Sequence, residues 1–262
     1  LEEVQSARLY NDIFTWETDQ TGPVGRMNPS SLVKMMEDLF ERSDKTERQK
    51  KLIDLCKDAY QNQVSYGRAT HKIIHEIFKD SKLVVIDPDD KKLKTLFIDQ
   101  MLEDIIENSS LSAIESNKSE MKKKGISIPI GGRKINHFYI ENGIRERIDL
   151  DGEFYSCAAW DSQLNKAQMT ELIRNNPDRI SPNALLRPSY QQKILPCSHY
   201  VCGGSEVMYW LELKALMAYQ NIIFPKLPIR SSAFILGKKV LEKIEKQGIA
   251  LEAIFRSDEA FL

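Results

Sequence analysis

A glycine turn carries the clearest chemical signal in the sequence, in the segment from Tyr200 to Glu206, which reads YVCGGSE. The pattern predicts a strand that turns through two glycines into a helix, and the first turn of such a helix has free backbone N–H groups. Glycine lets a ligand approach the backbone closely, and the helix dipole favours negative charge there. Gly203 and Gly204 are therefore candidate ligand residues, although an ordinary strand-to-helix turn capped by Ser205 has the same pattern.

A carboxylate follows at once, because Glu206 lies in the first turn of the expected helix. Its charge already complements the helix dipole and would repel an anion placed beside it. We therefore expect Glu206 to receive an ammonium or hydroxyl group of a substrate. The alternative is a helix-start acid that binds no ligand.

A second candidate site lies in the segment from Ser181 to Gln192, which reads SPNALLRPSYQQ. Pro188 disfavours helical geometry at Arg187 but suits the first position of the following helix. The Arg187 guanidinium would then lie beside a helix N-terminus, so we expect a carboxylate or phosphate partner, with an Asp or Glu of the same fold as the alternative. Asn183 and Gln191 either supply amide hydrogen bonds to a ligand or satisfy the backbone of the turn.

Two further arginines follow turn-like residues. Arg26 follows a glycine in the segment from Gly22 to Met27, and Arg230 ends a Pro-Ile-Arg run at the start of an expected strand. Either guanidinium could reach a ligand. An isolated arginine also commonly forms a surface ion pair, and that alternative stays open for both residues.

Two groups of residues have partial metal-ligand spacing. His71 and His75 are four residues apart on an expected helix, but no third ligand is evident. Cys197, His199 and Cys202 lie along an expected strand, where Cys202 would point away from the other two. We expect ordinary packing at both groups and predict no metal.

The composition limits the class of protein. The 262 residues are 42% hydrophobic and 29% charged with a net charge of −1, which gives no argument for binding nucleic acid or a membrane surface. No apolar run approaches the roughly 20 residues of a membrane span, and the start does not resemble a signal peptide. The cysteines are few and scattered, so we expect a reducing, cytoplasmic location. Leu1 and the abrupt end predict a piece of a longer protein.

Helices and strands must both position these candidates, and their pattern predicts an α/β fold. Asp44 and Glu47 have capping-box spacing before the second expected helix, Asn165 and Gln168 have it later, and Asn142-Gly143 predicts a hairpin. The strand, glycine turn, helix and strand from 198 to 236 predict a βαβ unit. Strands are expected over 9–16, 83–86, 135–140, 144–148, 198–202 and 229–236. Helices are expected over about 31–40, 45–60, 69–78, 93–105, 188–195 and 205–219, with another beginning at 165.

Three segments together resemble a known family. The run from Ser181 through Gln191, followed by Gly203-Gly204, Glu206, Tyr209 and Trp210, resembles the central signature of the bacillithiol-biosynthesis cysteine-adding enzymes. The stretches from Trp16 to Met27 and from Leu83 to Asp90 resemble two other family segments. The matches keep the family's order over most of the chain, although Ser205 stands where the family commonly has proline or glycine.

The resemblance implies a Rossmann-like parallel-sheet core with helical and β-hairpin insertions. Residues 1–262 would be the central portion of a ligase core, with a helical insertion at 28–80, a β-hairpin segment at 126–157, and a βαβ portion with the candidate ligand site at 158–262. Family members are about twice as long. Their amino-terminal Thr-Gly-His-Gln stretch and His-Asp pair, and their carboxy-terminal coiled coil that forms a homodimer, are absent from this sequence.

The resemblance also implies an activity, the addition of L-cysteine to glucosaminyl-malate in the last step of bacillithiol biosynthesis. Amide formation needs an activated acyl group, for which ATP is the expected cofactor, and we expect this piece alone to be inactive. The alternatives are an enzyme of the nucleotide-sugar transferase type and a non-catalytic binding or assembly module. No catalytic base is assigned, and the candidate ligand residues are Asn183, Arg187, Gln191, Gly203, Gly204 and Glu206, with Arg26 behind them.

Overall fold

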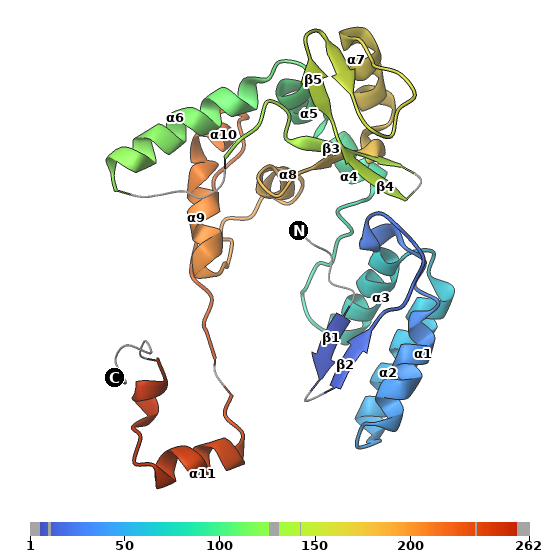
Figure 1. Cartoon of the computed structure of the whole chain (residues 1–262), viewed down its shortest axis with the longest axis vertical. Coiled ribbons are helices and arrows are strands. Elements are labelled where there is room, and N and C mark those ends of the chain that lie inside the picture. The colour runs from blue at the N-terminus through green and yellow to red at the C-terminus, as the bar shows by residue number, and fades with distance from the viewer. Residues whose placement is uncertain (1–5, 10–11, 126–130, 142, 234, 256–262) are drawn as a thin grey trace.

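The computed structural model describes residues 6–9, 12–125, 131–141, 143–233 and 235–255. Figure 1 shows two groups of elements, which we call the helical region (residues 6–86) and the body (residues 87–231). A separate carboxy-terminal segment extends away from the body to helix α11 (Lys238–Lys246). No helix in the described part of the chain is long and apolar enough to cross a membrane.

The helical region combines a small hairpin with three helices. Strands β1 (Ser6–Leu9) and β2 (Asp12–Thr15) pair antiparallel, so the single strand expected over 9–16 is wrong, although residues 10 and 11 lie outside the described part. In this pairing Ser6 lies opposite Thr15 and Leu9 opposite Asp12. The remaining elements are the 3₁₀ turn Val24–Arg26, α1 (Leu32–Glu41), α2 (Glu47–Asn62) and α3 (Tyr66–Phe78).

Two expectations for this region are corrected. Helix α2 begins after Thr46, whose hydroxyl accepts from Gln49 N–H while the Gln49 side chain accepts from Thr46 N–H. The capping box therefore uses Thr46 and Gln49 instead of Asp44 and Glu47. The apolar run 83–86 is not a strand, because no described strand pairs with it and the side chains of Leu83 and Val84 are exposed.

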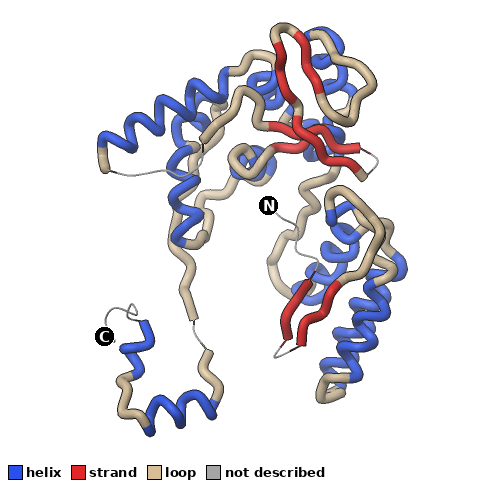
Figure 2. The backbone as a smooth tube through the Cα atoms, in the orientation of Figure 1, coloured by secondary structure: helices blue, strands red, loops and turns tan. Residues whose placement is uncertain are grey.

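The body is a mixed layer of helices and antiparallel strands, as Figure 2 shows in blue and red. Its main sheet has the order β4-β3-β7, and β5 and β6 form a second pair. The strands are β3 (His137–Glu141), β4 (Ile144–Arg147), β5 (Asp149–Asp151), β6 (Phe154–Ser156) and β7 (Ile180–Pro182). The helices are α4 (Lys91–Thr95), α5 (Ile98–Ile105), α6 (Ser109–Lys123), α7 (Lys166–Asn175), α8 (Arg187–Ile194), α9 (Gly204–Glu212) and α10 (Lys214–Tyr219).

Local sequence signals predicted several of these elements. The hairpin between β3 and β4 is confirmed around Gly143, while Asn142 lies outside the described residues. The capping box of α7 is confirmed, because Asn165 Oδ1 accepts from Gln168 N–H at 3.0 Å and Gln168 Oε1 accepts from Asn165 N–H at 2.9 Å. Two expected long helices are broken instead: 93–105 divides into α4 and α5, and 205–219 divides into α9 and α10 at Leu213.

The strands expected over 198–202 and 229–236 are not formed in the described residues, and only two parallel bridges join these segments. His199 pairs with Lys226 and Cys202 with Ile229, both parallel, and these pairs are isolated bridges. Tyr200 N–H donates to Lys226 O at 2.8 Å, and Arg230 N–H donates to Cys202 O at 2.8 Å. The α/β class is thus confirmed, with parallel pairing here and antiparallel pairing in the named strands. The divisions expected at 80, 126 and 157 stay predictions.

Two kinds of contact join the helical region to the body. One is a backbone contact between loops: Gly22 (φ +87°) lies so close to Gly143 (φ +76°) that a Cβ on Gly22 would be 2.0 Å from the Gly143 carbonyl oxygen. Both positions need glycine, because their φ angles lie in the left-handed region. The other is an ion-pair network between Arg26 of the helical region and residues of the body.

Candidate functional site

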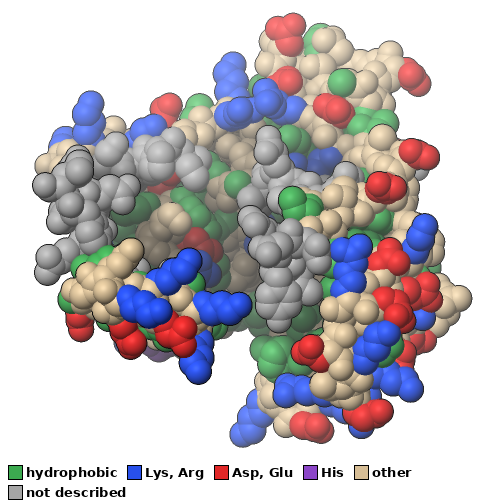
Figure 3. Space-filling model, turned by 60° about the horizontal axis from the view of Figure 1, so that its bottom comes forward, with side chains coloured by type: hydrophobic (Ala, Val, Ile, Leu, Met, Phe, Trp, Pro, Cys, Tyr) green, Lys and Arg blue, Asp and Glu red, His purple; other side chains and the backbone are tan. Residues whose placement is uncertain are grey.

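A cavity of about 350 Å³ lies between the helical region and the body, and we call it the arginine cavity. Its lining brings together three of the predicted ligand residues, Arg26, Asn183 and Arg187. Lys94 and Arg145 also line it, together with the carboxylates of Asp87 and Asp89, so cations outnumber acids. On the face drawn in Figure 3, the side chains of Lys and Arg are mixed with those of Asp and Glu. The arginine cavity is thus a place where positive charge is concentrated.

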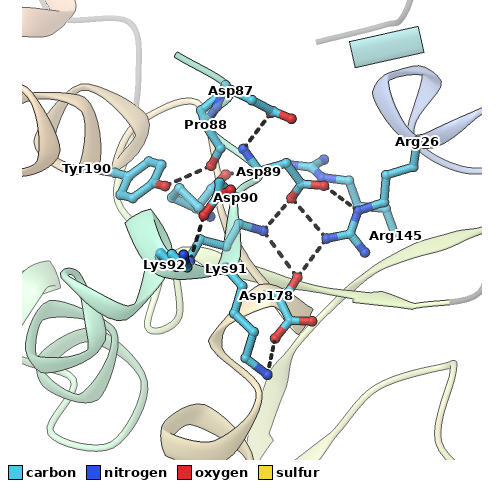
Figure 4. A network of polar contacts seen from close by, with 12 residues as sticks. Arg26, Asp87, Pro88, Asp89, Asp90, Lys91, Lys92, Arg145, Asp178 and Tyr190 are labelled. Carbon is cyan, nitrogen blue, oxygen red and sulfur yellow. Dashed lines mark hydrogen bonds and ion pairs between the residues drawn. The ribbon is translucent and has the colours of Figure 1, made fainter. Parts of the chain in front are cut away.

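One wall of the arginine cavity is the ion-pair network drawn in Figure 4. Arg26 Nε and Nη2 donate to the two Asp89 carboxylate oxygens at 2.6 and 2.9 Å, a bidentate pair. Lys94 Nζ donates to Asp89 Oδ1 at 2.6 Å, and Arg26 and Lys94 also donate to the backbone oxygen of Asp178. Arg26 is therefore in the cavity, as predicted, with its guanidinium already held by an acid.

Burial and charge act in opposite directions in this network. Burial alone would raise the pKa of Asp89, but the hydrogen bonds and charges of Arg26 and Lys94 outweigh it and lower that pKa below its usual value. Burial lowers the pKa of Lys94, which is 3% exposed, against the attraction of Asp89. Asp89 accepts hydrogen bonds from both cations, so its carboxylate offsets part of the positive charge of this wall.

The opposite wall is the turn that begins α8. Asn183 Oδ1 accepts from Leu185 N–H and Leu186 N–H at 3.0 Å each, and Asn183 O accepts from Arg187 N–H at 3.0 Å. The amide thus satisfies the turn's backbone and fixes the point at which the helix starts. Helix α8 begins at Arg187, one residue before the expected start at Pro188, and Pro188 lies in its first turn.

Arg187 differs from the other cations of the cavity. Its side chain is exposed, and its guanidinium forms no hydrogen bond or ion pair with any described residue. Arg26 and Lys94 are paired with Asp89, and the Arg145 guanidinium lies 3.9 Å from the centre of the Phe138 ring. The Arg187 guanidinium can therefore donate hydrogen bonds to an anionic group of a ligand.

Sequence reasoning assigned no site role to Tyr190, Asp89 or Lys94, which also line the arginine cavity. Tyr190 lies on α8, and its hydroxyl donates to Pro88 O at 2.7 Å, while burial raises its pKa. Asp87 accepts from Asp89 N–H at 2.9 Å and pairs with Arg68, so it shapes the turn. Asp89 and Lys94 carried no site signal beyond turn and helix spacing. Their partners are distant in sequence, which no local pattern reveals.

The glycine turn forms a separate cluster. Gly203 N–H donates to Glu206 Oε2 at 2.6 Å, so Glu206 caps its own helix and closes one of the amides expected to be free. That hydrogen bond lowers the pKa of Glu206, partly against burial. The Tyr200 and Tyr209 hydroxyls donate to Glu206 Oε1 at 3.3 Å each.

The surroundings of the glycine turn include two predicted arginines. Arg230 lies beside Gly203, because a Cβ built there would be 3.1 Å from Arg230 Nη2. Burial raises the pKa of Tyr209 to about 12, and the charge of Glu206 adds to this rise while Arg187 opposes it. The charge of Arg187 thus acts on Tyr209 beside the glycine turn as well as on Tyr190 in the arginine cavity. Gln191 lies one turn further along α8 and is not among the cavity-lining residues.

Several residues with partial metal-ligand spacing have other contacts, and the side chain of His199 is exposed. His71 Nε2 lies 3.0 Å from Val85 O, and its ring stacks on His75 with ring centres 6.4 Å apart. Cys202 is buried beside the parallel bridge to Ile229. Within the described ranges, no group of three or more His, Cys, Asp or Glu side chains could hold a metal ion.

Comparison with known proteins identifies related chains. Residues 1–231 match the family model described as "Bacillithiol biosynthesis BshC, N-terminal Rossmann-like domain". Among curated proteins named "Putative cysteine ligase BshC", the one from Cytophaga hutchinsonii is 31% identical over 98% of this chain and 47% of its own length. Those from Flavobacterium johnsoniae and Flavobacterium psychrophilum are each 30% identical, over 98% and 100% of this chain and 48% and 49% of their own lengths. The chain spans about half the length of these relatives.

Proposed function

Because the chain belongs to the BshC family of bacillithiol biosynthesis, we propose that it is part of a cysteine ligase. The complete enzyme would join the carboxyl group of L-cysteine to the amine of glucosaminyl-malate, and the present chain would not catalyse this reaction alone. The names of the relatives support the ligase class. The arginine cavity supports a substrate that carries carboxylates.

The observation that carries this proposal is the state of Arg187 in the arginine cavity. A guanidinium binds a carboxylate through two parallel hydrogen bonds, and it is most effective where no other acid occupies it. Asp89 occupies Arg26 and Lys94, whereas no described acid occupies Arg187. We assign Arg187 to a carboxylate of the malate portion of the substrate. Asn183 fixes the turn that presents it.

Glu206 is proposed as the acceptor for the substrate's ammonium or a hydroxyl group. Its Oε1 accepts from the Tyr200 and Tyr209 hydroxyls at 3.3 Å, which is longer than an ordinary O–H···O hydrogen bond. A cationic donor would compete well for this oxygen, because charge-assisted hydrogen bonds are stronger than neutral ones. Oε2 would keep its bond to Gly203 N–H.

ATP is the expected activator of the acyl group, but the glycine turn does not fit its phosphates. Glu206 already accepts the Gly203 N–H and places a negative charge at the helix start, where a phosphate would be repelled. We therefore derive no nucleotide step through Gly203 and Gly204. The arginine cavity is assigned to carboxylate recognition, and the full-length homodimer and cytoplasmic location implied by the resemblance remain part of the proposal.

The test is a ligase assay on the full-length protein with ATP, L-cysteine and glucosaminyl-malate, measuring bacillithiol. We expect Arg187→Ala to raise KM for glucosaminyl-malate by about 10- to 100-fold, because a hydrogen bond to a charged group contributes roughly 1.5 to 3 kcal/mol. Arg187→Lys should lie between, since lysine cannot bind bidentately. Arg174→Ala, at an exposed position on α7, is the matched control. If the wild type forms no bacillithiol, the proposed ligase activity is refuted. If KM is unchanged in Arg187→Ala, the assignment of the arginine cavity to the substrate carboxylate is refuted.

A further inference from the structure

A buried carboxylate lies behind the arginine cavity. The side chain of Asp104, on α5, is fully buried and accepts three hydrogen bonds. Asn136 N–H donates to Oδ2 at 2.7 Å, Asn136 Nδ2 donates to Oδ1 at 3.0 Å, and His137 Nδ1 lies 2.8 Å from Oδ2. Asn136 and His137 are buried as well, at the start of β3. We call these three residues the aspartate network.

The aspartate network continues directly to the cavity wall. Asn136 O accepts from Asn183 N–H at 2.8 Å, and Asn136 Oδ1 accepts from Asn183 Nδ2 at 3.2 Å. Asn183 in turn caps the backbone of the turn from which Arg187 starts α8. A continuous hydrogen-bonded path therefore runs from Asp104 through Asn136 and Asn183 to Arg187.

The aspartate network contains more polar groups than packing requires. Burying a carboxylate is costly unless its oxygens are fully hydrogen-bonded, and apolar residues of similar volume would fill the same space at lower cost. His137 Nε2 is buried and has no hydrogen-bond partner in the described structure, so the ring's polar contact is with Asp104. Four donors and acceptors of Asn136, its N–H, O, Nδ2 and Oδ1, are hydrogen-bonded to Asp104 or Asn183. Because Asn136 is held in this way, its two hydrogen bonds to Asn183 fix the position of Asn183.

We propose that Asp104, Asn136 and His137 are positioning residues, which fix Asn183 and through it the Arg187 guanidinium in the arginine cavity. None of the three lines the cavity. Asn136 is the link in this path, because it bonds to Asp104 on one side and to Asn183 on the other. The inference rests on the proposed function, since it takes Arg187 as the carboxylate-binding group.

The test measures the Kd of L-malate for the full-length protein by calorimetry. We expect Asn136→Ala to weaken binding by about 10- to 100-fold, because displacing a binding group by about 1 Å can cause losses of that size. Asn117→Ala is the matched control: Asn117 is similarly buried, and its Nδ2 donates to Leu211 O and Glu212 O at 2.8 Å each, away from the cavity. The control should lower Tm comparably and leave Kd unchanged.

The variants separate this inference from the proposed function. Loss of binding in Asn136→Ala, with unchanged Kd in Asn117→Ala, supports the network. Wild-type Kd in Asn136→Ala together with loss in Arg187→Ala overturns the network alone. Wild-type Kd in Arg187→Ala, or no binding of L-malate to the wild type, overturns the proposed site and the network with it. If Asn136→Ala does not fold, Asn183→Ala takes its place, with the same loss expected and an unchanged Kd overturning the inference.

Discussion

The body and the helical region are stabilised in different ways. The body has one continuous core, which includes large buried side chains such as Trp210, Phe97 and Met101. The helical region has two small clusters, around Trp16 with Met27 and Leu32, and around Ala59 with Ala69 and Ile73. Small clusters bury little apolar surface and stabilise little alone. The comparison indicates that the helical region depends on its attachment to the body.

That attachment is polar, and the arginine cavity lies on it. Arg26 reaches from the helical region to Asp89 and Asp178 of the body, as Figure 4 shows. Ion pairs that are partly exposed weaken as salt or acid increases, whereas buried apolar contacts respond much less. The geometry of the cavity is therefore more sensitive to conditions than the core of the body.

The largest effect should come from the core of the body. Trp210 is 1% exposed and stacks on Tyr200, with ring centres 4.3 Å apart. We expect Trp210→Ala to lower the free energy of unfolding of the body by about 3 to 5 kcal/mol, because it leaves a large cavity. Urea denaturation followed by circular dichroism measures this. Trp16→Ala should leave the same transition nearly unchanged, and equal shifts would show that both regions unfold as one unit.

Removing the charge of Asp89 should loosen the helical region without unfolding the body. Asp89→Asn leaves Lys94, whose side chain is 4% exposed, without its ionic partner, which we expect to cost about 2 kcal/mol. Hydrogen exchange should speed up in α3 while β3 stays protected. Asp58→Asn, which removes an exposed ion pair with Lys72, is the control and should change little. Equal exchange in wild type and Asp89→Asn would contradict the polar attachment.

A pH effect should arise in the body from Glu212. Its side chain is fully buried, its oxygens have no partner among the described residues, and burial raises its pKa to about 7. Because the folded pKa exceeds the unfolded value of roughly 4.3, its contribution to stability is present below that value and is lost as pH rises through 7. Tm should therefore fall from pH 5 to pH 8, by an amount equivalent to about 2 to 3 kcal/mol.

Glu212→Gln isolates that pH effect, because glutamine does not titrate. The Tm of this variant should change less between pH 5 and pH 8 than that of the wild type. Glu115→Gln, at an exposed position on α6, is the matched control and should retain the wild-type slope. The same slope in Glu212→Gln would assign the pH dependence to other groups.

The smallest effects should come from the capping box, a motif that occurs in both the helical region and the body. Thr46 and Asn165 form capping boxes at the starts of α2 and α7. Each alanine substitution should cost about 1 kcal/mol. Asn165→Ala should shift the urea transition of the body, whereas Thr46→Ala should appear only as faster hydrogen exchange in α2. A shift of the body transition by Thr46→Ala would couple the two regions more tightly than we expect.

Features set by neighbouring residues were predictable from the sequence. The hairpin at Gly143, the capping box at Asn165 and the start of α8 to within one residue of Pro188 each depend on residues within a few positions. The strand predicted over 83–86 was wrong, because a strand also needs a neighbouring strand to pair with, and an apolar run does not show whether one is present. Thr46 was missed because Ser43, Asp44 and Thr46 all precede α2 and all have side chains that can cap a helix.

Features set by distant residues were not predictable. Arg26, Asp89 and Asp178 meet only after folding, and no pattern along the chain relates them. The aspartate network was missed because Asn136 and His137 lie in an apolar run, where polar residues resemble chance interruptions of a strand. The sequence did contain one indication of the network: Asn136 and His137 are consecutive polar residues between the apolar residues Ile135 and Phe138. The glycine turn was located correctly, but the sequence did not show that Glu206 closes it.

The contact between Gly22 and Gly143 constrains how this protein can vary in evolution. Two loops separated by more than a hundred positions meet backbone to backbone, with no room for a side chain at Gly22. A substitution there cannot be compensated by a neighbour's side chain, since none takes part. The loop tips, usually the most tolerant parts of a chain, should accept neither bulk nor insertions here.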